Sequence, residues 1–177
     1  MPRKRTISNE DLLDVALDLV HDDGPAALSF GALASSTGLA ASTLVQRFGT
    51  RAELLQATLL RAWDHLDEAT AAADERAGDG VDGVVELLLA LGGDYDERDH
   101  ADQLLVLRED LRDPVLRARG AAWIALLTAA VERRVPDVDG ELVVAQWQGA
   151  VTVWGFTRSA PLPDVVERLL RQLLASA

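Results

Sequence analysis

The 177-residue chain contains no cysteine. Disulfides, thiolate metal sites and cysteine redox switches are therefore excluded. Its three histidines, His21, His65 and His100, lie far apart with no partner at i+4, so neither a metal site nor a metal cofactor is expected.

The chain also lacks any run of eighteen apolar residues, and its start, MPRKRTISNEDLL, has no apolar signal core. We therefore expect no membrane association, no secretion and a cytoplasmic location. No nucleophile elbow, phosphate-binding glycine loop or metal-hydrolase motif occurs, so the sequence predicts no catalytic residues, no cofactor and no enzyme activity.

Charge is unevenly distributed along the chain. The net charge is −12, but residues 1–55 carry five basic and seven acidic side chains, a net of −2, and residues 56–177 carry the remaining −10. The basic residues of the first part are Arg3, Lys4, Arg5, Arg47 and Arg51. A phosphate-binding surface is therefore possible only near the N-terminus.

Apolar residues make up 49% of the chain and recur with helical spacing, so we expect an all-α fold with a real core. In the segment 141–158, for example, Val143, Trp147, Ala150 and Trp154 recur at i, i+4, i+7 and i+11. A strand is the minor alternative there because the segment is rich in β-branched residues. The sequence predicts about nine helices, near residues 8–23, 30–36, 41–48, 50–77, 82–91, 101–111, 114–131, 141–158 and 163–175.

Residues 29–55 have the pattern of two short helices around a glycine turn, followed at once by a long helix. Ser29 is a suitable N-cap, and Gly38 supplies the positive φ that a tight turn needs. Thr50 and Glu53 form a T-x-x-E capping box that starts the next helix. This arrangement predicts a helix-turn-helix, with an ordinary helical hairpin as the alternative.

The stretch resembles the TetR family of bacterial one-component regulators, whose DNA-binding head ends in a junction of the type F-G-S/T-K/R-x-E-L-L. The matching residues are Phe48, Gly49, Thr50, Arg51, Glu53, Leu54 and Leu55. The resemblance is specific over residues 8–55 and vaguer beyond. It implies a helix-turn-helix head at 1–48 and an effector-binding and dimerisation domain at 49–177.

Three positions depart from the family pattern. Val45 stands where the family usually has a phosphate-binding tyrosine, Arg47 where it has a histidine, and Ala40 where it has a Ser or Thr cap. Arginine pairs bidentately with phosphate or guanine, so we expect Arg47 to replace the lost contact.

The head is expected to bind double-stranded DNA through the arm, the cap of the second helix, the third helix and the junction. A basic arm of this kind contacts phosphates or the minor groove, with a disordered tail as an equal alternative. The candidate residues are Arg3, Lys4, Arg5, Ser29, Ala41, Ser42, Thr43, Val45, Gln46, Arg47 and Arg51.

The resemblance implies that a small molecule binds the large domain. An apolar or aromatic effector is expected, because the few aromatic residues there are the natural pocket lining, although core packing is the more common role of a buried tryptophan. The candidate effector-binding residues are Trp63, Tyr95, Arg108, Trp123, Gln146 and Trp147.

The last two helices carry more apolar surface than one partner helix covers, and in the family such helices pair across a two-fold axis. A homodimer would present two heads to a palindromic operator, so a repressor released by its effector is the leading interpretation. An all-helical ligand-binding or interaction protein that has lost operator binding is the alternative. The candidate interface residues are Trp154, Val166, Leu169, Leu170 and Leu173.

Overall fold

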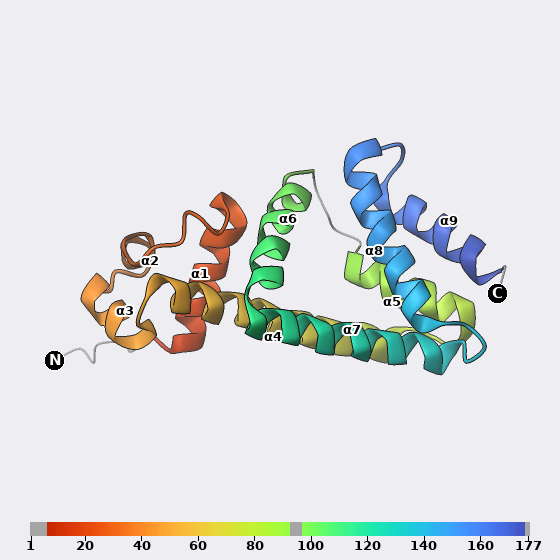
Figure 1. The fold of residues 1–177 in the computed structure, drawn as a ribbon, viewed down its shortest axis with the longest axis horizontal. Coiled ribbons are helices and arrows are strands. Elements are labelled where there is room, and N and C mark those ends of the chain that lie inside the picture. The colour runs from red at the N-terminus through yellow and green to blue at the C-terminus, as the bar shows by residue number, and fades with distance from the viewer. Residues whose placement is uncertain (1–6, 93–96, 176–177) are drawn as a thin grey trace. The chain divides into compact units, whose positions relative to one another are not determined.

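A computed structural model describes residues 7–92 and 97–175, of which residues 97–103 are described by their backbone alone. Every regular element in these ranges is an α-helix (Figure 1). The nine helices are α1 (Asn9–Asp23), α2 (Phe30–Thr37), α3 (Ala41–Phe48), α4 (Arg51–Arg76), α5 (Gly80–Gly92), α6 (Glu97–Arg112), α7 (Pro114–Arg134), α8 (Gly140–Thr157) and α9 (Leu162–Leu174).

The all-α fold and its helices agree with the expectation from sequence, including a helix at α8 in place of the alternative strand. The largest difference is at α6, which begins at Glu97, four residues before the expected start at Ala101. The segment Glu97–Asp102 is highly charged, so hydrophobic periodicity gives no signal for its first turn.

The boundaries of the N-terminal helices are fixed by local hydrogen bonds. Ser8 and Asp11 form a reciprocal capping box at the start of α1, with bonds of 3.0 and 3.2 Å. The Ser29 hydroxyl accepts the Ala32 N–H at the start of α2. Gly38 ends α2 with φ +71°, a left-handed conformation that disfavours any residue with a Cβ.

The junction between α3 and α4 has the expected capping box. The Thr50 N–H donates to the Glu53 carboxylate over 2.7 Å, and the Glu53 N–H donates to the Thr50 hydroxyl over 3.2 Å. Hydrogen bonding to the Thr50 backbone N–H, and then to the Thr50 side chain, lowers the pKa of the Glu53 carboxyl below its usual value. Because only Gly49 and Thr50 separate the two helices, the end of α3 is joined closely to the start of α4.

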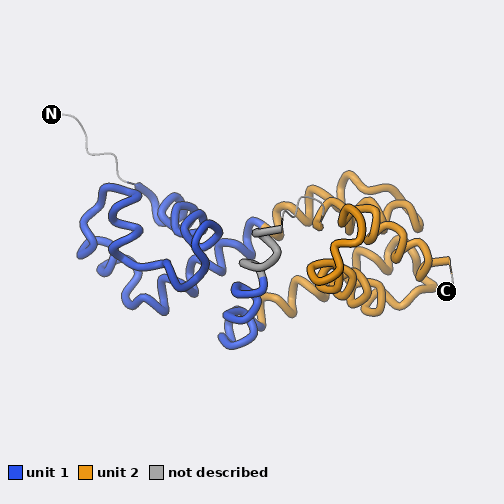
Figure 2. The backbone as a smooth tube through the Cα atoms, turned by 90° about the horizontal axis from the view of Figure 1, so that it is seen from above, with its two compact units in different colours: residues 1–65, 102–117 blue, residues 66–101, 118–177 orange. Residues whose placement is uncertain are grey.

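The chain forms two compact units (Figure 2). Unit 1 comprises residues 1–65 and 102–117, and unit 2 comprises residues 66–101 and 118–177. This division differs from the boundary expected after residue 48, because the first half of α4 and the end of α6 pack with the head.

Unit 1 has a core of aliphatic side chains from five helices and the loop before α2. Leu116, at the start of α7, joins this core although it is distant in sequence from the head. The fully or almost fully buried members are Leu12, Ala16, Val20, Leu28, Leu33, Leu44, Leu54, Leu59 and Leu116. The helix-turn-helix therefore rests on a scaffold that includes parts of α4, α6 and α7.

Unit 2 is built on α5, α8 and α9, together with the later parts of α4 and α7. The stripe expected on α8 is buried, as are Trp123, Leu127 and Val131 of α7. Gly83 of α5 lies so close to the backbone of Gly78 that a Cβ would stand 1.8 Å from its carbonyl oxygen. Close backbone approach thus fixes the turn between α4 and α5.

Among the described residues, α7 is the one helix whose length and mean hydropathy, 1.2 over eighteen residues, would allow it to cross a membrane. Core helices of soluble proteins pass the same test. This helix supplies core residues to both units, including Leu116 and Trp123.

Candidate nucleic-acid interface and effector region

The exposed face of α3 is formed by short, uncharged side chains. Leu44 is fully buried and Phe48 is half-buried against the unit 1 core, whereas Ser42, Val45 and Gln46 face solvent. Ala41 is also exposed, and Thr43 is half-buried at the edge of this face. The helix-turn-helix thus presents a flat surface whose side chains are small enough to enter a DNA groove.

Arg47, the one cationic residue of α3, turns away from that face. Its Nη1 donates to the carbonyl oxygen of Ile7 over 2.8 Å and to Oδ1 of Asn9 over 3.4 Å. The side chain therefore connects the end of α3 to the start of α1. We expected a direct base or phosphate contact, and the structure instead gives Arg47 a connection inside the head.

Arg51 also makes its hydrogen bonds within unit 1. Its Nε donates to the Leu28 carbonyl over 2.7 Å, and its Nη2 donates to the carbonyls of Pro25 and Ala26 over 2.9 and 3.1 Å. These three carbonyls belong to the loop that precedes α2. Arg51 therefore fixes that loop to the start of α4, a role that sequence reasoning missed because its partners lie 23 to 26 residues away.

The remaining expected DNA-binding residues are Ser29 and the arm. Ser29 is half-buried and uses its hydroxyl oxygen as the α2 cap, which leaves the hydroxyl proton for a further acceptor. Arg3, Lys4 and Arg5 lie outside the described residues.

Two hydrogen bonds connect α4 to the end of α6 within unit 1. Gln56 Nε2 donates to Asp113 over 2.7 Å, and Trp63 Nε1 donates to Asp110 over 3.2 Å. Asp113 also accepts the backbone N–H groups of Val115 and Leu116, so it caps α7. The Gln56 bond and the Leu116 N–H are the main causes that lower the pKa of the Asp113 carboxyl.

Asp110 is a buried carboxyl whose environment favours its neutral form. Burial raises its pKa, the Trp63 N–H opposes that shift, and the negative charge of Asp113 adds to it. Because the folded-state pKa is raised, this group favours folding more as the pH falls through that pKa. Near neutral pH the buried Asp110 carboxyl in the contact between α4 and α6 therefore lowers the stability of the folded state.

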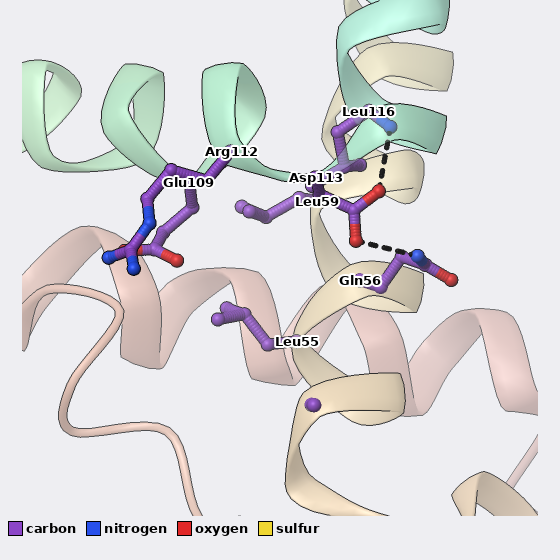
Figure 3. A pocket seen from close by; sticks show the side chains of 8 residues that line it. Leu55, Gln56, Leu59, Glu109, Arg112, Asp113 and Leu116 are labelled. Atoms are coloured by element: carbon purple, nitrogen blue, oxygen red, sulfur yellow. Dashed lines mark hydrogen bonds between the residues drawn. The ribbon is translucent and has the colours of Figure 1, made fainter.

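A pocket of about 360 Å³ lies beside these bonds (Figure 3). Its apolar wall comes from the leucines of α4 and α7, and polar side chains of α4 and α6 surround it. The lining residues are Ala52, Leu55, Gln56, Leu59, Glu109, Arg112, Asp113 and Leu116. None was a candidate from sequence, because each helix looks like ordinary amphipathic surface until α4 and α6 are placed together.

Comparison with known protein families matches the N-terminal part of the chain that contains the helix-turn-helix. Residues 12–58 match the family model for bacterial regulatory proteins of the tetR family. The matched range contains the helix-turn-helix, the Arg51 contacts and Gln56. No curated protein matches the chain.

Solved structures extend the TetR-type fold to almost the whole chain. A TetR-family member from Streptomyces coelicolor is 22% identical with a TM-score of 0.71, covering 94% of this chain and 99% of its own. A transcriptional regulator from Saccharomonospora viridis in complex with choline is 16% identical with a TM-score of 0.72, covering 93% of each chain. FadR from Bacillus subtilis in complex with stearoyl-CoA is 14% identical with a TM-score of 0.66, covering 94% and 97%.

The expected effector residues of this TetR-type chain fall into both units. Trp63 and Arg108 lie in unit 1, where Arg108 is an exposed partner of Glu109. Trp123 and Trp147 lie together in unit 2, with ring centroids 6.3 Å apart and planes inclined by 49°. Gln146 is half-buried next to Trp147 in α8. Tyr95 lies outside the described residues.

The two tryptophans of unit 2 differ in how their indole N–H groups are used. Trp123 Nε1 donates to the Thr70 hydroxyl over 2.9 Å. Trp147 is 4% exposed, and its Nε1 has no hydrogen-bond partner among the described residues. A buried donor without a partner carries a desolvation cost of about 1–3 kcal/mol, so Trp147 is the stronger candidate for a ligand contact.

The expected dimer residues of the TetR-type fold are largely internal to unit 2. Trp154, Val166 and Leu170 are buried between α8, α9 and their neighbours, so their side chains offer almost no surface to a partner. The Trp154 N–H donates to the Ala160 carbonyl within the same unit. Leu169 and Leu173 are half-buried. Sequence periodicity identified the apolar face of α9 and could not show that its own unit covers most of it.

The geometry predicts that Arg51 stabilises the free head. Arg51→Ala should lower the free energy of unfolding by about 1–2 kcal/mol, because three loop carbonyls lose a charged donor. Urea denaturation followed by circular dichroism measures this change. Arg108→Ala is the matched control and should change stability by less than about 0.5 kcal/mol, since its side chain is exposed and pairs with an adjacent residue. Equal stability of the two variants would contradict the structural role.

Proposed function

We propose that the protein is a homodimeric, ligand-responsive transcriptional regulator, a repressor that occludes a promoter by binding a palindromic operator. The observation that carries the proposal is the α2–turn–α3 unit inside the residues that match the tetR family model, with the uncharged face of α3 exposed. Arg47 of α3 and Arg51 of α4 make contacts within unit 1. A small molecule bound to unit 2 would release the operator. The geometry requires no catalytic step.

Electrostatics sets the conditions under which such a protein binds DNA. The net charge of −12 opposes any polyanion, and the one cation of α3, Arg47, is half-buried and bonded to Ile7 and Asn9. Phosphate contacts must therefore come from the N-terminal arm, backbone N–H groups and hydroxyl donors such as Ser29. Few cations imply few displaced counterions, so the salt dependence of binding should be shallow for a DNA-binding protein.

Mobility-shift and footprinting assays on the DNA flanking the gene for this protein test the proposal. We expect a sequence-preferring complex at moderate salt whose footprint has two-fold symmetry. Removing Arg3, Lys4 and Arg5 together should weaken binding to all duplexes and reduce the salt slope. Absence of any sequence-preferring complex would favour the alternative of a helical ligand-binding protein without operator binding.

The surface that best supports dimerisation is the outer face of α8. Leu142, Val153 and Phe156 are exposed there, and Phe156 is 85% exposed. Leu142, Gly149 and Phe156 are spaced by seven residues, so they follow one line along the helix. Two copies of such a face can pack together, with Gly149 allowing close approach and the half-buried Leu169 and Leu173 of α9 adding apolar area.

Phe156→Glu should therefore convert the dimer into a monomer in sedimentation experiments. The charge would enter an apolar interface, and the monomer would lose affinity for a palindrome because it presents one head. Leu126→Glu, on the exposed side of α7, is the control and should leave the dimer intact. A dimer that survives Phe156→Glu would exclude this face as the interface.

We propose that the effector binds at the two tryptophans of unit 2. Trp147 offers a buried N–H to an acceptor on the ligand, and the tilted Trp123 ring supplies apolar contact. These features fit a small apolar or aromatic compound that carries a carbonyl or similar acceptor. Binding must favour one arrangement of the heads over the other, which in known systems amounts to about 1–3 kcal/mol of coupling.

A pair of substitutions distinguishes the two indoles. Trp123→Phe and Trp147→Phe remove the same ring volume, but only Trp123→Phe breaks a bond, to the Thr70 hydroxyl. In the free protein, Trp123→Phe should be less stable than Trp147→Phe by about 1 kcal/mol in urea denaturation. Equal losses would mean that the Trp147 N–H is already satisfied, and the effector site would have to lie elsewhere.

A further inference from the structure

We propose that α3 reads A·T base pairs, with Gln46 contacting an adenine edge and Val45 a thymine methyl group, and that guanine is not read by this helix. The inference rests on the proposed function, because it assumes that α3 lies in a major groove. It names the class of operator that the exposed side chains fit.

The reading surface is defined by burial along α3. At about 100° per residue, Ser42, Val45 and Gln46 fall within about 100° of one another, on the side opposite Leu44. All three are exposed, and Val45 retains 45% of its surface. A hydroxyl, an aliphatic group and a carboxamide therefore stand together at the centre of the surface that would enter the groove.

Each of these groups has a preferred partner among base edges. A glutamine amide donates and accepts at once, which matches the N7 acceptor and N6 donor of adenine. The branched side chain of Val45 packs against the thymine C5 methyl, the one apolar group in the major groove. Guanine presents two acceptors, O6 and N7, and is best matched by two donors from one cationic side chain.

No cation of the helix-turn-helix is available to supply those two donors. Arg47 holds the Ile7 carbonyl and Asn9, on the side of α3 that faces α1. Arg51 holds three carbonyls before α2. The bonds of Arg47 Nη1 turn its guanidinium toward α1 and those of Arg51 hold it at the loop before α2, whereas Gln46 and Val45 are exposed on the face of α3.

Arg47 is therefore a positioning residue. By joining the last turn of α3 to Ile7 and Asn9, it sets how α3 is oriented on α1. Its loss should reduce affinity for all operator sequences by a similar factor and leave the order of base preferences unchanged.

The test starts with selection of bound duplexes from a library randomised in both half-sites, using the full-length protein. We expect A·T pairs at the positions that α3 covers. Gln46→Ala should then reduce the preference for A·T over G·C at one position of each half-site by about 5- to 150-fold.

Replacing thymine by uracil in the selected duplex removes one methyl group and isolates the Val45 contact. The wild-type protein should bind the uracil duplex about fourfold more weakly per lost contact. Val45→Ala should bind both duplexes equally. Val81→Ala, which shortens an exposed valine of α5, is the matched control and should remain sensitive to uracil.

The possible outcomes separate the two levels of the proposal. A selected half-site rich in G·C that Arg47→Ala abolishes would overturn the A·T inference while leaving the regulator intact. Wild-type binding that is indifferent to uracil would exclude the Val45 contact. Failure to select any sequence would overturn the regulator itself.

Discussion

The helix-turn-helix depends on how Arg51 ties the loop before α2 to the first turn of α4. The guanidinium donates to three backbone carbonyls of this loop, those of Pro25, Ala26 and Leu28. Without Arg51, these carbonyls would need water or another donor. Fixing this loop sets where α2 begins, and the Gly38 turn then sets where α3 lies. Arg47 completes the arrangement from the other end of α3. The head thus uses two of its few cations to hold its own backbone.

That use of cations has consequences for recognition. A chain with a net charge of −12 gains little from long-range attraction to DNA, and the cations of its helix-turn-helix bind carbonyls within the head. The specific binding proposed above would then rely more on complementary base contacts than on charge. The uncharged exposed face of α3 is consistent with this expectation. Added salt weakens the affinity that comes from hydrogen bonds and methyl contacts less than the affinity that comes from phosphate contacts.

The contact between α4 and α6 also involves the start of α7. Asp113 accepts from Gln56 of α4 and caps α7 at the same time, so the position of α4 and the start of α7 depend on one carboxylate. Asp110 adds a carboxyl whose burial raises its pKa, so its charged form is disfavoured there. Contacts that are held at a cost are suited to elements that change position, because less free energy opposes their rearrangement.

Sequence predicted the helices well because their signals are local. Each cap or turn bonds backbone groups within four residues of itself, and the sequence predicted each of them correctly. They are the Ser8–Asp11 and Thr50–Glu53 capping boxes, the Ser29 cap and the Gly38 turn.

The roles of the head's arginines could not be found in this way. The carbonyl partner of Arg47 is 40 residues away, and a backbone carbonyl has no residue-type signal at all. Composition suggested DNA contacts for Arg47 and Arg51, and it could not indicate the internal contacts that the structure adds for each of them.

The same reasoning explains why the effector and interface residues were harder to assign than the fold. Helical periodicity shows that Val166 and Leu170 lie on an apolar face, but burial depends on whether α5 and α8 cover that face. Because α5 and α8 cover that face, the exposed apolar surface lies instead at residues such as Phe156, outside the buried stripe of α8. Relatives that are 14 and 16% identical keep the fold around ligands as different as stearoyl-CoA and choline. For the effector site proposed above, a buried donor without a partner such as the Trp147 N–H is a more specific observation than aromatic content.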